Sequence, residues 1–266
     1  MKIFALSDIH VDYPANKKWL ESLSEFEYLE DLLILAGDVS DSLTLLEWSL
    51  QTLRRRFKQV LYVPGNHDLW VVRDGAGHQS MDKFAHIASV VENCGASMQP
   101  YHSGSLSVVP LLSWYDYSFG EPGSELLANW MDFRACRWPQ DFGVNEITEH
   151  FLHANLPMLS TVNETVISFS HFLPRIDVMP SFIPAAKRFI YPVLGSSRLE
   201  AQVRQLNPAI HVYGHSHVNQ QIRLDGTLYV NNAFGYPQET RITAKRLLCI
   251  HEMDDIMQAV PAANAP

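Results

Sequence analysis

Residues that can bind metal ions follow five short apolar segments of the chain. The five polar clusters are Ser7-Asp8-Ile9-His10, Gly37-Asp38-Val39-Ser40-Asp41, Gly65-Asn66-His67-Asp68, Ser170-His171-Phe172 and Gly214-His215-Ser216-His217. They hold five of the 12 histidines. Aspartate, asparagine and histidine supply oxygen and nitrogen ligands for divalent first-row metals, so the clusters predict a metal site.

The spacing within these clusters favours a pair of ions. Asp8 and His10 are two positions apart and lie on the same side of an extended chain, as do His215 and His217. The carboxylate of Asp38 has two oxygens and can bridge two ions. Because no thiolate accompanies these ligands, the set favours Mn, Fe, Zn or Co. Two such ions, roughly 3.5–4 Å apart, clamp a phosphoryl group and activate water.

The elements that must position these clusters alternate between strands and helices. In the first half, the pattern predicts strands at 2–6, 31–37 and 60–65 and helices at 15–26, 42–56 and 78–93. Buried strands separated by helices pair in parallel and give an α/β core. In an open α/β sheet, ligands bind at the carboxyl ends of the strands, where the clusters stand.

The second half predicts its own, partly antiparallel sheet. We expect strands at 105–112, 165–170, 209–214 and 245–253, helices at 146–160 and 198–206, and a hairpin within 221–232. The Asp225-Gly226 pair is a typical hairpin turn between alternating segments.

Taken in order, the motifs D-x-H, G-D-x-x-D, G-N-H-[DE], S-H and G-H-x-H between positions 8 and 217 resemble those of the calcineurin-like metallophosphoesterase superfamily. The resemblance implies a four-layer αββα sandwich of two mixed sheets with flanking helices. It implies a metal-dependent phosphoric ester hydrolase, a phosphatase or phosphodiesterase of a small, nucleotide-like phosphomonoester or phosphodiester. Ligands from both halves must meet, so we expect one domain over residues 1–266.

Carried over position by position, the resemblance assigns roles to the cluster residues. One ion is held by Asp8, His10, Asp38 and His217, and the second by Asp38, Asn66, His171 and His215. A metal-bound hydroxide attacks phosphorus, and His67 protonates the leaving alkoxide as general acid. Asp41 resembles the residue that orients this histidine, although it also stands where an N-cap of the helix at 42–56 would lie. Asp68 is expected to order its loop.

An aromatic-rich segment at about 113–142 interrupts the pattern and is interpreted as an insertion or cap. Residues 114–142 contain eight aromatic side chains. One interpretation is that they contact the substrate, with Trp114 and Tyr115 nearest the site; the other is a hydrophobic cluster under a long loop. Arg175 is a candidate to clamp a phosphate oxygen, against an unrelated surface role.

Composition narrows the function class. The formal net charge of −9 argues against broad attraction to nucleic acid, although a nuclease of the same fold is one alternative. A catalytically idle, protein-binding scaffold is the other. Cys94, Cys136 and Cys249 are too widely spaced for a zinc knuckle and indicate reduced thiols. Without a signal peptide or an apolar stretch of 18 residues, we expect a cytoplasmic protein with no membrane partner.

Overall fold

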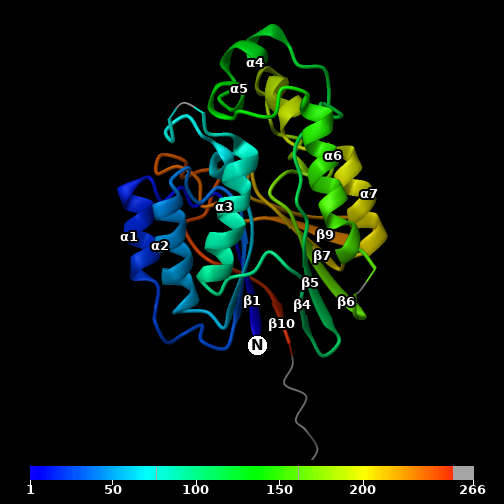
Figure 1. Ribbon diagram of the computed structural model, residues 1–266. Helices are drawn as coiled ribbons and strands as arrows, with labels where there is room; N and C mark the ends of the chain where they lie inside the picture. Colours follow the sequence, from blue (N-terminus) through cyan, green and yellow to red (C-terminus); the bar gives the residue numbers. More distant parts are fainter. Residues whose placement is uncertain (76, 161, 254–266) are drawn as a thin grey trace, which may run out of the picture.

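The computed structural model describes residues 1–75, 77–160 and 162–253, and these form two sheets flanked by helices (Figure 1). In the first sheet, β1 (Lys2–Leu6), β2 (Leu32–Ala36) and β3 (Gln59–Val63) are parallel, and β10 (Leu248–Glu252) joins antiparallel to β1. The helices α1 (Pro14–Ser22), α2 (Leu43–Arg54) and α3 (Ser80–Asn93) cover its outer face.

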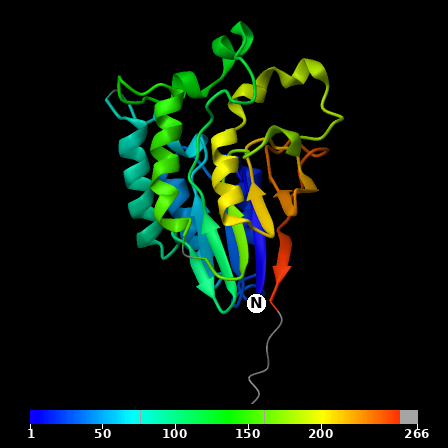
Figure 2. The ribbon, with the colours of Figure 1, turned by 90° about the vertical axis from the view of Figure 1, so that its right-hand side faces the viewer.

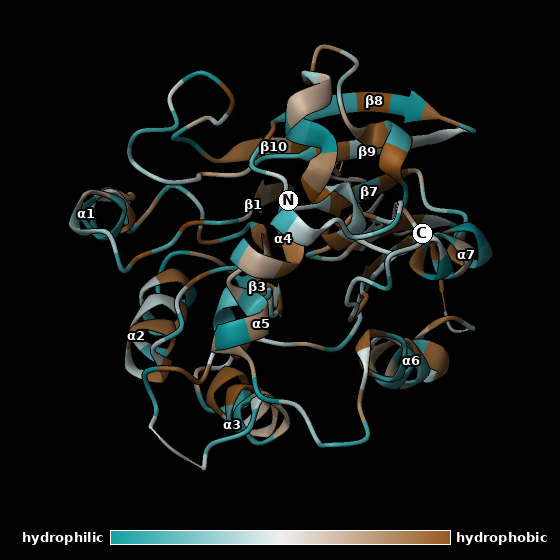
Figure 3. Cartoon of the chain, turned by 90° about the horizontal axis from the view of Figure 1, so that it is seen from above, coloured by the Kyte–Doolittle hydropathy of each residue, from teal (hydrophilic) through white to brown (hydrophobic). Residues whose placement is uncertain are grey.

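The second sheet has six strands in the order β4-β5-β6-β7-β9-β8. Its strands are β4 (Tyr101–Ser103), β5 (Leu106–Pro110), β6 (Thr165–Phe169), β7 (Ile210–Tyr213), β8 (Gln220–Leu224) and β9 (Thr227–Asn231). β5, β6, β7 and β9 are parallel, whereas β4 and β8 are antiparallel edges. The helices α6 (Val144–Asn155) and α7 (Ser197–Leu206) lie outside this sheet (Figure 3).

The hydrophobic core between the two sheets confirms the predicted αββα sandwich. Apolar side chains of both sheets, such as Ile34 and Val63 from the first and Ile167 and Val212 from the second, form one buried cluster. The alternate side chains of the same strands pack against the helices on either side. Stacked sheets bury the strands on both faces, which explains their nearly continuous apolar sequences.

Two predictions about the elements need correction. Residues 245–253 were expected in the second sheet, but β10 pairs with β1 because its apolar side chains cover the free edge of the first sheet. The predicted helix at 146–160 begins at Val144 and ends at Asn155, followed by the 3₁₀ turn Leu156–Met158. Proline at 157 lacks the N–H that would continue the helix.

The segment 113–142 contains two short helices, α4 (Ser124–Asn129) and α5 (Asp132–Ala135), above the carboxyl ends of the strands (Figures 1 and 2). A 3₁₀ helix at Ala185–Val193 packs beside α4. Within the described part of the chain, no helix has both the length and the apolar character needed to cross a membrane.

Candidate metal centre

The five polar clusters meet at the carboxyl ends of strands from both sheets. Asp8 and His10 follow β1, Asp38 follows β2, and Asn66 follows β3. On the second sheet, β6 and β7 deliver the remaining three ligands, His171, His215 and His217. All seven predicted ligands are buried, with at most 9% of any residue exposed. The sequence prediction of a common edge therefore agrees with where the structure places these residues.

The ligand atoms form two groups, which we call the first and second half-sites. The first half-site is Asp8, His10, Asp38 and His217, and the second is Asp38, His171 and His215. Within each group, the ligand atoms lie within 4.8 Å of one another. Asn66 extends the second half-site, because its Oδ1 is 3.2 Å from His171 Nε2.

The donor atoms converge as a pair of divalent ions requires. In the first half-site His10 Nε2 is 3.2 Å from His217 Nε2, and in the second His171 Nε2 is 3.2 Å from His215 Nδ1. The two oxygens of Asp38 face different half-sites, with Oδ2 4.0 Å from His10 Nε2 and Oδ1 3.5 Å from His171 Nε2. Buried nitrogen and oxygen donors in this arrangement fit two first-row metal ions that share one carboxylate.

Backbone strain is concentrated at the same positions. Of the eight non-glycine residues with positive φ in the described chain, five are predicted ligands: Asp8, His10, Asp38, His215 and His217. The left-handed conformation is unfavourable for residues with a Cβ and persists where the surrounding structure enforces it. Here the strained turns aim several side chains from short loops at one centre.

Two glycines permit the close approach of the loops. A Cβ at Gly65 would lie 2.1 Å from Asp38 Oδ1. At Gly37, where φ is +83°, it would lie 2.5 Å from His171 Nδ1. Any side chain at either position would displace a predicted ligand, which explains why glycine precedes the ligand in both clusters.

The ligand histidines are oriented by partners on their other ring nitrogen. His217 Nδ1 lies 2.7 Å from the carboxylate oxygen Oε2 of Glu239, whereas His171 Nδ1 donates to the carbonyl of Ala36 at 2.8 Å. His215 Nε2 donates to the carbonyl of Val193 at 3.0 Å. Such partners fix the tautomer and ring direction of metal-binding histidines.

These partners shift the pKa of His217 in the opposite direction from the pKa values of His171 and His215. Burial alone would lower the pKa of His217, but the adjacent carboxylates of Asp8 and Glu239 outweigh it and raise the pKa to about 10. In the second half-site, burial lowers the pKa of His171 and His215, with no carboxylate on their outer nitrogens to oppose it.

His67, the predicted general acid, borders the first half-site. Its Nε2 is 3.9 Å from Asp38 Oδ2, and its ring lies beside that of His10 and stacks on Trp70 with 3.6 Å between centroids. Burial, followed by the neighbouring histidines, lowers the pKa of His67 well below its usual range. A bound anionic phosphate favours the protonated ring and opposes this shift.

Asp41 does not contact His67 through a hydrogen bond among the described residues. Its carboxylate pairs with Arg73, whose Nη1 is 3.1 Å from Asp41 Oδ1. The alternative N-cap interpretation is wrong, because Ser42 caps α2 by accepting a hydrogen bond from the Leu45 amide. The expected orienting role of Asp41 therefore stays a prediction.

Asp68 orders its loop, as predicted. Its carboxylate accepts hydrogen bonds from the backbone N–H groups of Asp38, Val39, Ser40 and Gly65 at 2.8–3.0 Å. It thereby ties the loop after β3 to the loop after β2 and fixes the backbone of the shared ligand.

The prediction that Trp114, Tyr115 and Arg175 contact the substrate is wrong. Trp114 and Tyr115 are each 1% exposed and pack on Phe172 in the hydrophobic core, so neither ring is available to a substrate. The Arg175 guanidinium forms ion pairs that include Asp177 and Asp225. With those carboxylates satisfying it, this arginine acts as a link between loops.

Two functional side chains were missed by sequence reasoning, Glu239 and Asp132. Asp132 lies within 113–142, and its Oδ1 accepts a hydrogen bond of 2.8 Å from the Asn66 amide. Both carboxylates lie outside the motifs, and neither has a spacing from its partner that would indicate contact.

A cavity of about 540 Å³ opens beside the first half-site and His67. Aromatic and aliphatic side chains line it together with one arginine; the lining residues are His10, Asp12, Tyr13, Asp41, Leu45, His67, Trp70, Arg73 and Tyr236. The Arg73 guanidinium is held there by Asp12 and Asp41. The cavity therefore combines aromatic surface with two carboxylates and one arginine that pairs with both of them.

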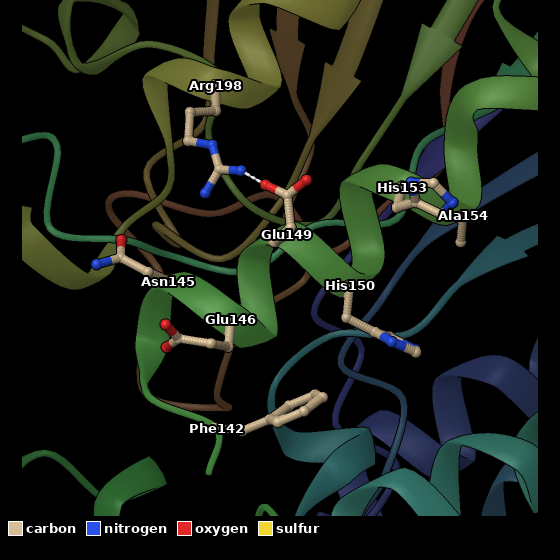
Figure 4. Close-up of a pocket in the computed structure, with 8 residues that line it drawn as sticks. All are labelled: Phe142, Asn145, Glu146, Glu149, His150, His153, Ala154 and Arg198. Carbon is tan, nitrogen blue, oxygen red and sulfur yellow. Dashed lines mark ion pairs between the residues drawn. The ribbon is translucent and has the colours of Figure 1, made fainter.

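A second hollow, of about 570 Å³, lies along α6 and shares no lining residue with this cavity (Figure 4). Its residues include His150 and His153, whose helical spacing could in principle bind metal. Both histidines are exposed, and in the described chain neither belongs to a group of converging metal ligands.

Comparison with known proteins agrees with this geometry. The family described as calcineurin-like phosphoesterase matches residues 1–219, a range that contains every predicted ligand. The chain is 28% identical over 263 residues to the [acyl-carrier-protein] phosphodiesterase PptH of Mycobacterium tuberculosis (strain ATCC 25618 / H37Rv), covering 90% of this chain and 79% of that protein.

The fold also matches a solved structure. The crystal structure of phosphopantetheinyl hydrolase (PptH) from Mycobacterium tuberculosis superposes with a TM-score of 0.78 at 23% sequence identity. The match covers 100% of this chain and 98% of that one. It confirms the predicted arrangement of two mixed sheets with flanking helices.

Proposed function

We propose that this chain, which belongs to the calcineurin-like phosphoesterase family, cleaves the phosphodiester that joins a phosphopantetheinyl group to a carrier protein. As a family member it is a metal-dependent hydrolase of phosphate esters that uses two divalent ions. The substrate is the proposed part. It differs from the small-molecule ester expected from the sequence, because the relative that aligns with 90% of the chain acts on a protein.

The observation that carries the proposal is the cavity beside the metal centre. Its volume of about 540 Å³ exceeds what a bare phosphoryl group needs and leaves room for an organic substituent on the ester. Tyr13, Leu45 and Tyr236 offer apolar and aromatic contact, and the exposed guanidinium of Arg73 can donate hydrogen bonds to a phosphate or carbonyl oxygen.

The proposed mechanism assigns each side chain a task. Asp8, His10, Asp38 and His217 would hold one ion, and Asp38, Asn66, His171 and His215 the other. When bound, two divalent ions polarise the phosphoryl oxygens and lower the pKa of water. His67 would hold a proton on Nε2, the nitrogen that faces Asp38, and deliver it to the leaving oxygen. Trp70 keeps the ring of His67 in place by stacking on it.

The test is to incubate the Mn²⁺-loaded chain with a carrier protein in its phosphopantetheinylated form. We expect the intact mass of the carrier protein to fall by that of the phosphopantetheinyl group, and an Asp38→Asn variant to leave it unchanged. Activity on bis(p-nitrophenyl) phosphate without cleavage of the carrier protein would refute the substrate while leaving the reaction class in place. Single- and double-stranded DNA in parallel reactions test the nuclease alternative.

A further inference from the structure

The carboxylate of Asp132 lies where three side-chain donors converge. Asp132 is 3% exposed and belongs to the short helix α5. Its Oδ1 accepts hydrogen bonds from Asn66 Nδ2 at 2.8 Å and Trp70 Nε1 at 2.7 Å, and its Oδ2 accepts one from Trp130 Nε1 at 2.8 Å. All three hydrogen bonds are donated by N–H groups, so both carboxyl oxygens of Asp132 act as acceptors.

This carboxylate decides which way the amide of Asn66 faces. The terminal torsion of asparagine is broad and nearly two-fold, so the side chain itself does not select between its oxygen and its nitrogen. Asp132 Oδ1 is the acceptor of this contact, and an amide oxygen cannot donate to it, so Nδ2 faces Asp132. Oδ1 is then directed to the opposite side, where it lies 3.2 Å from His171 Nε2 in the second half-site.

The same carboxylate also holds two indole rings against the centre. Trp70 stacks on His67 with 3.6 Å between ring centroids, and Trp130 meets the ring of His215 edge-on at 5.9 Å. Both indole N–H groups bond to Asp132. One side chain thus connects a ligand of the second half-site, the ring beside another ligand, and the ring that supports His67.

We propose that Asp132 is a positioning residue that holds the Asn66 amide with its oxygen toward the ion of the second half-site. The segment 113–142 would accordingly serve the metal centre, through Asp132 and Trp130, instead of recognising the substrate. The inference rests on the proposed assignment of Asn66 as a ligand. It does not depend on which ester the enzyme cleaves.

The decisive measurement is Mn²⁺ binding to the Asp132→Ala variant of the full chain, by calorimetry and electron paramagnetic resonance without substrate. We expect the second ion to bind about 10- to 100-fold more weakly, as for lost outer partners of metal ligands, while the first keeps its affinity. At two equivalents of Mn²⁺, the spectrum should then change from that of a coupled pair to that of an isolated ion. A folded variant that binds both ions with unchanged affinity, and is only less thermally stable, would overturn the proposal.

Two further variants separate positioning from general stability. Arg134→Ala changes an exposed side chain of the same helix α5 that bonds to the Ala128 carbonyl, and should leave the affinity for the second ion unchanged. In the double variant Asn66→Asp with Asp132→Asn, the amide at position 132 can donate to the carboxylate at position 66. We expect it to bind the second ion more tightly than Asn66→Asp alone, and equal or weaker binding would contradict the inference.

If Asp132→Ala does not fold, the Asp132→Leu variant of similar size provides the same test, because its side chain accepts no hydrogen bond from Asn66. Unchanged binding of the second ion to that variant would refute the positioning role. Since all these affinities are measured without substrate, failure of the phosphopantetheinyl proposal in the carrier-protein assay would be a separate result.

Discussion

The two half-sites of the centre are held by different kinds of partner. In the first, His217 lies between two carboxylates, with Asp8 Oδ1 at 3.3 Å and Glu239 Oε2 at 2.7 Å. In the second, His171 and His215 are held by main-chain carbonyls. The only carboxylate that the two half-sites share as a ligand is Asp38.

The kind of partner affects how strongly each half-site binds its ion. Carboxylates on both sides of an imidazole make it a stronger base and concentrate negative charge, which favours a cation by Coulomb attraction. Neutral carbonyls fix direction but add no net charge. We therefore expect the first half-site to bind its ion more tightly, and the second to depend more on the alignment of its ligands.

The largest effect is expected from removing the shared ligand. Asp38→Ala should abolish high-affinity binding at both half-sites and lower kcat/KM at least about 10³-fold, since metal ions supply several kcal/mol of transition-state stabilisation. Metal content after gel filtration and hydrolysis of bis(p-nitrophenyl) phosphate are the measurements. The exposed Asp82 of α3, changed to alanine, is the matched control. Retention of both ions would show that Asp38 does not link the half-sites.

Next in size is the loss of the proposed acid beside the first half-site. His67→Ala should lower kcat on an alkyl phosphodiester by about 10²–10⁴-fold, because the leaving alkoxide needs a proton. The loss should be much smaller with bis(p-nitrophenyl) phosphate, since p-nitrophenolate leaves without protonation. The metal content should not change. An equal loss on both esters would argue for a binding role instead.

The Glu239→Gln variant tests whether the two half-sites are supported independently. It removes an outer partner of the first half-site, as Asp132→Ala does for the second. Removing the outer carboxylate of His217 should weaken Mn²⁺ binding at the first half-site by about 10- to 100-fold and spare the second. Calorimetric titration of the metal-free protein resolves the two ions. If Glu239→Gln and Asp132→Ala weakened the same ion, the division into two independently supported half-sites would be wrong.

The smallest expected effect is on the pH dependence of stability and comes from His211. This histidine is buried outside the metal centre and hydrogen-bonds with Ser168 and Ser170. Burial lowers its pKa to about 3, so it stays neutral in the folded protein at pH values where the unfolded chain is protonated. Its stabilising contribution is complete above pH 6.5 and decreases as the pH falls toward 3.

Between pH 7 and 5.5, wild type should therefore lose about 1 kcal/mol more unfolding free energy than His211→Asn. Urea denaturation of both metal-free proteins at each pH measures the two free energies of unfolding. The metal-site residues titrate in both proteins, so their contribution cancels when wild type is compared with the variant. A wild-type protein that gained stability relative to the variant at the lower pH would contradict the assignment.

Most of the candidate site could be predicted because its signals are local. Each cluster is a short strand followed by a turn, and every predicted ligand lies within a few residues of a strand end. Asp132 and Glu239 were missed because they act across 66 and 22 residues of sequence, on partners with which they share no motif. A carboxylate in a loop carries no mark that distinguishes a partner of a ligand from a solvated side chain.

The errors in the fold have the same origin. β10 pairs antiparallel with β1 at the edge of the first sheet, and nothing in its own sequence indicates which sheet it joins. Trp114 and Tyr115 follow a strand directly, as the ligands do, but their rings turn into the core against Phe172. Strand-end position alone does not specify the side to which a large apolar ring turns.

The sequence by itself determined the chemistry of this protein. The sequence shows the types and the order of the ligands, and it shows that each ligand follows a buried strand. These signals are local, because a short turn places a side chain only a few residues beyond the end of its strand. The tertiary structure alone decided how the centre is held. It placed Glu239 behind His217, Asp132 behind Asn66 and the rings of Trp114 and Tyr115 in the core. Burial and hydrogen-bond satisfaction depend on neighbours that only folding brings together.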